Sequence, residues 1–241
     1  MKKLTFLVAI LGSFSVAHAS SVLDQTYVSV KLGASIAEAN DLHNKYDNVH
    51  NDYSTLTSTY GNGLSRKVSE DDTVFTGSIA YGYAFETAPV RAELEYTFRN
   101  KSTLNPALWT NRNTEAEVRT QNLMANVYYD FKNSSSFTPY VSAGLGASFN
   151  KLNVTESVAN VVTERANDKK TDFAWSVGLG LNYEISKNLD LDFAYRYMDS
   201  GKVNATHNYR EIGYDYDYSE RSNYDTKLKN HDFTVGLRYN F

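Results

Sequence analysis

The sequence predicts an all-β fold: an eight-stranded antiparallel up-and-down transmembrane β-barrel with four long extracellular loops and three short periplasmic turns. Three observations predict it. Eight segments alternate between apolar and polar residues, the connections between them alternate between long and short, and aromatic residues are abundant. The chain has 241 residues, with 19 tyrosines, 12 phenylalanines and no cysteine. This length suits one domain, and a chain without cysteine has no disulfides, thiolate metal sites or cysteine nucleophiles.

The first nineteen residues predict a cleaved signal peptide. Lys2 and Lys3 precede an uncharged, mostly apolar segment, and Ala17-His18-Ala19 supplies the small residues that signal peptidase requires. The apolar segment is too short for a helix that spans a membrane, which needs roughly 20 residues. The alternative to a signal peptide is an N-terminal helix that is buried in the folded protein. We expect cleavage after Ala19, which leaves residues 20–241 as the barrel domain.

Eight segments show the two-residue period of strands with one apolar and one polar face. In segment 90–98, for example, Leu94 and Tyr96 face one way, whereas Glu93 and Glu95 face the other. Segments of roughly ten residues match the length of a tilted membrane strand. The eight segments are residues 26–36, 75–85, 90–98, 122–131, 141–149, 172–185, 189–198 and 232–241.

The connections predict the orientation of the barrel. Short connections are expected at residues 86–89, 132–138 and 186–188, and long ones at about 38–72, 100–118, 150–170 and 200–230. Short periplasmic turns and long outer loops are typical of outer-membrane barrels. A soluble two-sheet sandwich would show the same alternation. The signal peptide, the loop asymmetry and the end of the chain favour the barrel, because a sheet in lipid cannot keep an unpaired edge.

The end of the chain carries an apolar face that terminates in an aromatic residue. Its members are Phe233, Val235, Leu237, Tyr239 and Phe241. This pattern resembles the terminal β-signal that the barrel-assembly machinery of Gram-negative outer membranes reads. We therefore expect these five residues to act as the assembly signal.

Several segments resemble the opacity proteins and related small outer-membrane surface antigens. They are Ala125–Phe131, Phe137–Val141, Gly144-Leu145-Gly146, Tyr195-Arg196-Tyr197 and Val235–Phe241. The likeness extends from about residue 120 to the end, outside the loops. It implies an eight-stranded outer-membrane barrel, and some members of the family adhere to host receptors. The identity of a receptor does not transfer, because no long loop here matches a known receptor-binding loop.

The interior of an eight-stranded barrel is just wide enough for side chains. The polar faces of the predicted strands place these charged residues inside: Lys31, Arg91, Arg196, Arg238, Glu93, Glu95, Asp130, Glu184, Asp190 and Asp192. Since an isolated buried charge costs several kcal/mol, we expect ion pairs across the lumen. The hypothesis pairs Glu93 and Glu95 with Lys31, Arg91 or Arg238. A charged constriction that tunes ion passage is the alternative.

The long loops carry whatever is particular to this protein. Residues 38–72 contain seven acidic and three basic residues. The last loop holds five tyrosines as candidate contacts: Tyr209, Tyr214, Tyr216, Tyr218 and Tyr224. The alternation from Tyr214 to Tyr218 predicts a hairpin ribbon above the membrane. Tyrosine serves as a contact residue in binding surfaces, although pairing of the rings across the ribbon is an equally good interpretation.

The sequence predicts no catalytic residue, cofactor or metal site. The histidines of the mature chain are His43, His50, His207 and His231, and no spacing places a nucleophile beside a base. The pairs Asp71-Asp72 and Asp215-x-Asp217 lack the glycine turn and closing glutamate of a calcium loop. The chain is therefore not expected to be an enzyme.

The predicted function is that of an adhesin-like outer-membrane surface protein whose loops contact ligands. A narrow porin and a purely structural protein are the alternatives. The expected partners are outer-membrane lipids and lipopolysaccharide, the barrel-assembly machinery and a host-surface receptor. The formal net charge of −4 excludes a polybasic nucleic-acid binder, and we expect a monomer.

Overall fold

The computed structural model describes residues 25–65, 67–108, 113–158 and 161–241. The predicted signal peptide, residues 1–19, lies outside the described residues. The strands are β1 (Thr26–Asp52), β2 (Thr57–Leu64), β3 (Val68–Ala84), β4 (Val90–Arg99), β5 (Ser102–Leu104), β6 (Asn113–Asp130), β7 (Phe137–Val158), β8 (Val161–Ser186), β9 (Leu189–Ile212) and β10 (Tyr216–Asn240). No helix among the described residues is long and apolar enough to cross a membrane.

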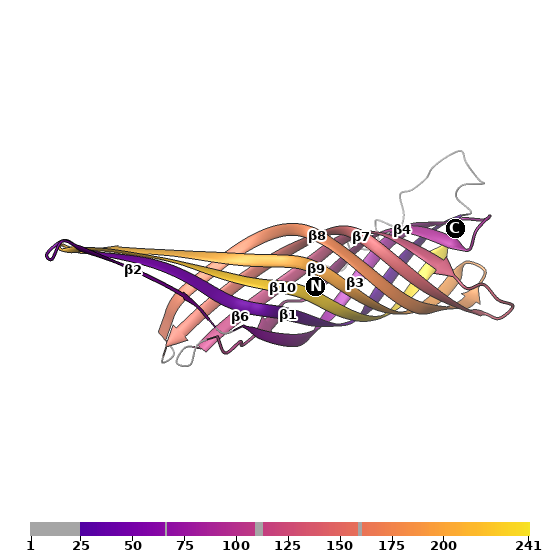
Figure 1. Cartoon of the computed structure of the whole chain (residues 1–241). Helices are drawn as coiled ribbons and strands as arrows, with labels where there is room; N and C mark the ends of the chain where they lie inside the picture. Colours follow the sequence, from indigo (N-terminus) through magenta and orange to yellow (C-terminus); the bar gives the residue numbers. More distant parts are fainter. Residues whose placement is uncertain (1–24, 66, 109–112, 159–160) are drawn as a thin grey trace, which may run out of the picture.

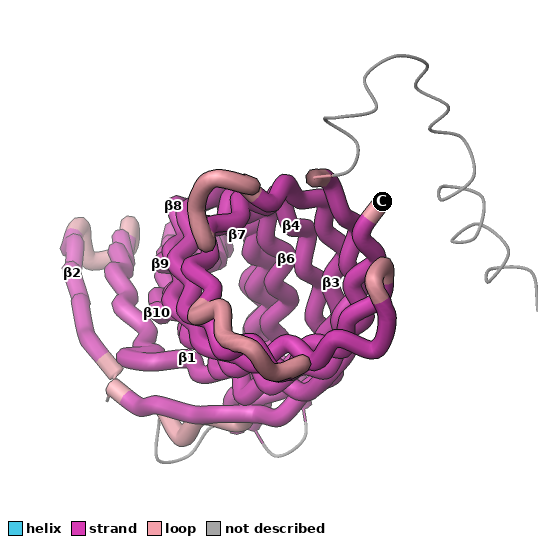
Figure 2. The backbone as a smooth tube through the Cα atoms, turned by 90° about the vertical axis from the view of Figure 1, so that its right-hand side faces the viewer, coloured by secondary structure: helices cyan, strands magenta, loops and turns pink. Residues whose placement is uncertain are grey.

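Eight of these strands close into a ring. Each pairs antiparallel with its neighbour in the order β1, β3, β4, β6, β7, β8, β9, β10 and back to β1. β2 pairs with the outer half of β1, and β5 pairs with β6. Figure 2 shows the ring from the end that carries the short turns. The predicted fold class is therefore confirmed.

The pairing of β1 with β10 closes the ring. It extends from Tyr27 opposite Asn240 to Asp52 opposite Tyr216, with one register shift between Asn40 and His43. This long ladder leaves no free sheet edge within the barrel wall, as a strand surrounded by lipid requires.

Near the short turns the barrel wall is apolar outside and charged inside, whereas farther from the turns the inside is apolar. Near the turns, outward residues such as Leu32 and Leu94 are more than half exposed, while Lys31 and Glu95 are buried inside. Farther from the turns, the interior is an apolar cluster, whose members include Leu42, Leu104, Leu152, Val154, Val203 and Leu228. Lipid outside one zone and water outside the other account for the inversion, because apolar surface belongs outside only in lipid.

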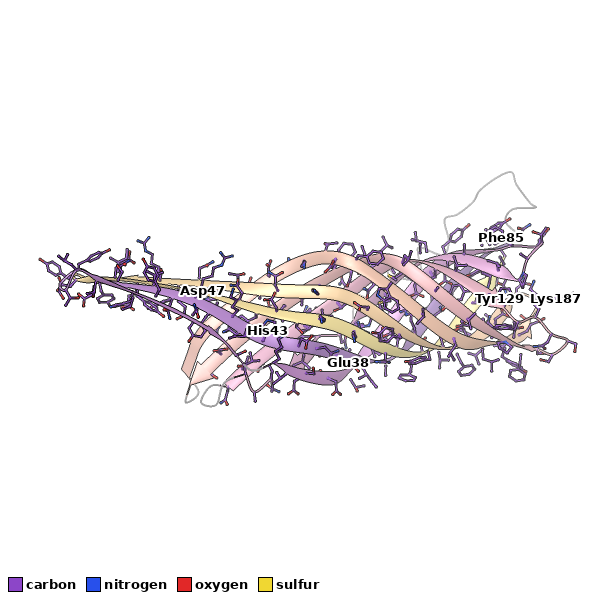
Figure 3. All side chains as sticks on the ribbon, in the orientation of Figure 1. Glu38, His43, Asp47, Phe85, Tyr129 and Lys187 are labelled. Carbon is purple, nitrogen blue, oxygen red and sulfur yellow. The ribbon has the colours of Figure 1, made fainter. Side chains whose placement is uncertain are left out.

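Exposed aromatic residues mark both boundaries of the lipid-facing zone. The ring at the turn end includes Phe85, Tyr129, Phe131, Phe137, Tyr239 and Phe241, and the other includes Phe75, Phe98, Phe149, Phe173, Trp175 and Phe233. Phe85 and Tyr129 lie at the end of the barrel that carries the short turns, together with Lys187 (Figure 3). Such aromatic girdles occupy the two membrane interfaces of outer-membrane barrels.

The segments expected as long loops are mostly strand. β1 continues to Asp52, β9 to Ile212, and β10 starts at Tyr216, so the ribbon expected around Tyr214–Tyr218 is present. Residues 43–64 and 204–225 form a four-stranded sheet, hereafter the arm, in the order β9, β10, β1, β2. The arm projects far beyond the rest of the molecule (Figure 1). Glu38, His43 and Asp47 follow one another along β1 from the barrel into the arm (Figure 3).

Irregularities at one level mark the base of the arm. The ladders shift register between Asn40 and His43 and between Lys227 and Lys229. Asp41 has a φ of 57°, a left-handed conformation that Asp tolerates better than most residues. Its carboxylate lies 2.9 Å from the Lys227 ammonium, which joins the two bulged strands. Bulges bend and twist strands, so they account for the departure of the arm from the barrel wall.

A close backbone approach at the seam yields the first prediction. A Cβ atom built on Gly33 would lie 1.9 Å from the Phe233 carbonyl oxygen, which belongs to the opposite strand and cannot rotate away. We expect Gly33→Val to lower the free energy of unfolding by about 3 kcal/mol, measured by urea titration of the refolded protein in lipid vesicles. Ala34→Val is the matched control, because Ala34 faces outward. Equal stability of the two variants would show that the seam tolerates a side chain at residue 33.

Candidate functional site: the barrel interior and the arm

Glu95 lies at the centre of the charged interior and is completely buried. One of its oxygens is 3.4 Å from Lys31 Nζ. The other accepts hydrogen bonds from the Arg196 guanidinium and, at 2.7 Å, from the Thr97 hydroxyl. Lys31 belongs to β1, two strands from β4 in the ring, and Arg196 belongs to β9, the strand opposite β4, so Glu95 ties β1 and β9 to β4 across the interior.

Glu93 lies one inward position from Glu95 and shares its cation. Its carboxylate is 3.8 Å from Lys31 Nζ, and it accepts a 2.7 Å hydrogen bond from the Tyr128 hydroxyl. Lys31 in turn donates to the Tyr128 oxygen over 3.4 Å. The structure thus brings Lys31, Glu93 and Glu95 together, as one of the hypothesised pairings has it.

The other two cations of that hypothesis have different partners. Arg91 donates two hydrogen bonds to Asp130, at 2.8 and 2.9 Å, and its guanidinium lies 4.4 Å from the centre of the Tyr128 ring. Arg238 lies 2.6 Å from Asp190 on the adjacent strand β9. Both arginines therefore pair with aspartates of adjacent strands rather than with Glu93 or Glu95. Asp190 lies directly opposite Arg238 in the ladder, and Asp130 lies two residues along β6 from Tyr128, the residue opposite Arg91.

An arginine and an aspartate that the sequence reasoning missed complete this network. Arg99 donates to Asp232 at 3.1 and 2.6 Å, and both residues are buried. Asp232 also lies 3.0 Å from Arg196, so it bridges two arginines. The predicted strand ended at residue 98 and thereby excluded Arg99. The alternation of Arg91, Glu93, Glu95 and Thr97 would have reached it one step later.

Two acidic residues of the predicted interior differ in their surroundings. Asp192 is buried and accepts hydrogen bonds from the Tyr140 hydroxyl at 2.9 and 3.1 Å. Glu184 is exposed beside the short turn between β8 and β9. The expectation that Glu184 lies among the buried charges is therefore wrong: at the rim of the barrel, water solvates its carboxylate.

On one face of the arm, tyrosines are tethered by their hydroxyl groups. Tyr209 and Tyr216 donate to the two oxygens of Glu211, over 2.8 and 2.6 Å, and Tyr218 donates to Glu220. Cross-strand register places these residues together, with Tyr218 opposite Glu211 and Glu220 opposite Tyr209. These five residues are hereafter the tyrosine face.

Ionisation shifts on the arm agree with these hydrogen bonds. The hydroxyls of Tyr216 and Tyr209 hold the pKa of the Glu211 carboxyl below its usual range. Partial burial, reinforced by the Glu220 carboxylate, raises the pKa of Tyr218 to about 12. At neutral pH the carboxylates therefore accept and the tyrosines donate. The His50 ring adds to the same face, with its centre 5.9 Å from that of Tyr216 and nearly parallel to it.

The remaining predicted contact tyrosines lie apart from this face. Tyr214 is 99% exposed at the tip of the β9–β10 hairpin. Tyr224 is completely buried in the apolar cluster at the base of the arm, so the expectation that it is a surface contact is wrong. Tyr218 and Tyr224 are an even number of residues apart on β10, so their side chains lie on the same face of the strand. Where the arm joins the barrel wall, that face becomes the barrel interior.

The described residues contain no group of three or more His, Asp or Glu side chains that could hold a metal ion. Asp217 belongs to the Asp215-x-Asp217 pair considered above as a calcium site, and its carboxylate lies 2.8 Å from the Arg210 guanidinium. Asp72, from the other, accepts a hydrogen bond from the Thr103 backbone N–H at 3.0 Å.

The residues of the expected assembly signal all face outward. Each of Phe233, Val235, Leu237, Tyr239 and Phe241 is about half exposed. The first four pair with β1 at the seam.

A closed antiparallel ring with an apolar exterior and a charged interior defines a transmembrane β-barrel. The model of the outer membrane protein beta-barrel domain family matches residues 6–241, and the chain belongs to this family. It is a protein of the bacterial outer membrane, where its wall contacts lipid.

Individual proteins of the outer membrane also resemble the chain. The chain is 32% identical over 238 residues to outer membrane protein PagN of Salmonella typhimurium, covering 92% of each chain. It is 27% identical over 179 residues to a putative adhesin of Rickettsia bellii, covering 70% of this chain and 76% of that protein. Among solved structures, it resembles Neisserial surface protein A with a TM-score of 0.44 at 18% identity, covering 90% and 97% of the two chains. The resemblance to small outer-membrane surface antigens is confirmed at the level of the family.

The charge network yields the second prediction. Replacing Glu93 and Glu95 by Gln leaves Lys31 and Arg196 buried with fewer counter-charges, which costs about 3 kcal/mol or more. We expect the double variant to lose that amount of unfolding free energy in a urea titration in lipid vesicles. Glu86→Gln, in an exposed turn, is the control and should match the unchanged protein. A double variant as stable as the control would contradict the stabilising role of these pairs.

Proposed function

We propose that the protein attaches the bacterial surface to a host or environmental ligand through the tyrosine face of the arm, while side chains occlude the barrel interior. The observation that carries this proposal is the set of hydroxyl-tethered tyrosines on a sheet that projects far beyond the membrane. The similarity to the Rickettsia bellii protein that is named a putative adhesin supports the same class of function.

The interior offers little support for a passage. Arg99, Glu95, Tyr128 and Tyr140 reach into it from strands around the ring, and each is buried. Their hydrogen bonds cross the interior between strands that are not neighbours, as with Arg99 and Asp232 or Arg196 and Glu95. In an eight-stranded barrel such side chains fill the available width. This supports a structural role for the charges and a function that resides outside the barrel.

The arm has the properties of a prepared contact surface. A tyrosine that binds a partner loses rotational freedom, and that loss weakens binding. Here Glu211 and Glu220 already hold Tyr209, Tyr216 and Tyr218 through their hydroxyl groups. Aromatic rings bring a large contact area at low entropic cost, as they do in antibody paratopes. The tyrosine face is therefore ordered before a ligand arrives.

For secretion and assembly, the proposal keeps the route that the sequence predicts. We propose that residues 1–19 are removed on export, and that the barrel-assembly machinery recognises the outward face from Phe233 to Phe241. Supporting this, β10 pairs with β1 and so is the strand that completes the ring. A ring that closes on itself needs no partner for its edges, which supports a monomer.

The third prediction tests the tyrosine face. The triple substitution of Tyr209, Tyr216 and Tyr218 by Ala should reduce attachment of a non-adherent laboratory bacterium displaying the protein to cultured epithelial cells by about tenfold or more, since each buried contact tyrosine is worth over 1 kcal/mol. The same tyrosines changed to Phe keep the rings but lose the tethers, and should give an intermediate loss.

The control changes the opposite face of the same four strands. Asn62, Asn208 and Arg221 lie on that face according to the register, and their triple Ala variant should attach as the unchanged protein does. Surface amounts are equalised by flow cytometry. Equal attachment by the tyrosine variant and this control would refute the proposal.

A further inference from the structure

Three cations stand directly beside one another on the outer surface of the barrel. Arg119 of β6 lies opposite Lys151 of β7, and Lys151 lies opposite Lys169 of β8. Their side chains share the outward face, and Arg119 and Lys169 are exposed. Like charges directly across a ladder repel and destabilise a sheet. This arrangement, hereafter the basic row, therefore calls for an anion that balances it.

The described part of the chain does not neutralise the basic row with ion pairs of its own. Within the described ranges, no ion pair involves any of the three residues, although other outward cations at this level are paired. Lys101 pairs with Glu117, and Lys227 lies 2.9 Å from Asp41. Glu117 is two residues from Arg119 on the same face, but it is engaged by Lys101.

The basic row lies at the membrane boundary far from the short turns. Phe149 precedes Lys151 by two residues on the same face, which places their Cα atoms roughly 7 Å apart along the strand. Phe173 follows Lys169 by four residues, and both phenylalanines belong to the exposed aromatic ring described above. The long arm projects from this side, so the row faces the headgroups of the outer leaflet.

A hollow of about 400 Å³ adjoins one end of the basic row. It is lined by Arg99, Asn100, Lys101, Arg119 and Gln121. The Arg99 guanidinium is bound to Asp232 inside the barrel and Lys101 pairs with Glu117, so the lining groups that can meet a ligand are Arg119 and the amides of Asn100 and Gln121. Guanidinium and amide groups bind phosphate oxygens and sugar hydroxyls. The hollow and the row meet at Arg119, which borders both.

We propose that the basic row binds the phosphate groups of the glycolipid in the outer leaflet, with the adjoining hollow receiving part of the sugar headgroup. Guanidinium and ammonium groups form charge-assisted hydrogen bonds with phosphate. A phosphate between neighbouring strands relieves the repulsion among all three cations at once. The site belongs to β6, β7 and β8, so it stands independently of the tyrosine face on β9 and β10.

The test uses the refolded full barrel in detergent micelles and counts bound lipids by native mass spectrometry. The probes are diphosphoryl lipid A, monophosphoryl lipid A and dephosphorylated lipid A. We expect affinity to fall in that order for the unchanged protein. The variant R119Q/K151Q/K169Q should bind diphosphoryl lipid A about tenfold or more weakly, because it loses the charge-assisted contacts with phosphate.

The control variant K45Q/K132Q/K187Q removes the same charge from exposed residues outside the row. It should bind diphosphoryl lipid A like the unchanged protein, and heat-modifiable migration on gels confirms that each variant is folded. The proposal is overturned if dephosphorylated lipid A binds equally well, or if both triple variants lose the same affinity. Competition by a soluble sulfated polysaccharide or inorganic phosphate, without binding of lipid A, would also overturn it by assigning the row to a soluble anion.

Discussion

The hydrogen-bonded pairing of β1 with β10 is the interaction on which the rest of the structure depends. Hydrocarbon offers no partner for backbone N–H and C=O groups, so each free sheet edge would cost several kcal/mol for every unpaired group. β1 and β10 pair with each other from Tyr27 and Asn240 onwards, so neither of these two strands keeps a free edge in the barrel wall. Because the ring contains eight strands, its interior is narrow, and because lipid surrounds it, polar side chains must turn inward.

The narrow interior and the inward direction of the polar side chains explain where charged residues are buried and where the charged zone ends. A narrow interior brings opposite charges from facing strands within reach, so Glu95 can hold Lys31 and Arg196 together. Beyond the membrane boundary water replaces lipid, and the interior becomes an apolar cluster around residues such as Leu152 and Leu228. The arm continues the same ladders into water and needs no new fold. Its tyrosine face and the basic row are two separate surfaces, one directed beyond the cell and one towards the membrane.

The sequence predicts the ring well, because lipid on one side imposes a strict alternation that is visible in single residues. It predicts the arm poorly: in water both faces of an extended hairpin are polar, so the period of β1 beyond Ile36 fades although the strand continues to Asp52. Parity along each strand predicts most of the charged residues that face the interior, but it does not predict which of them form ion pairs with each other. The predicted strand ends one residue before Arg99, so the sequence does not assign Arg99 to the interior. Glu184 has the inward parity, but it lies at the rim of the barrel, where water solvates its carboxylate. Which cation meets which anion depends on strand register, which alternation within one strand does not contain.

The central claim, that side chains occlude the barrel and function lies outside it, is tested most directly by single-channel recording of the refolded mature chain in planar bilayers. Heat-modifiable migration first establishes that the protein is folded. The account predicts a silent bilayer, because buried ion pairs and tyrosines fill the width of an eight-stranded barrel. Discrete, reproducible conductance steps would contradict it, since they require a continuous aqueous path past Glu93, Glu95 and Arg196.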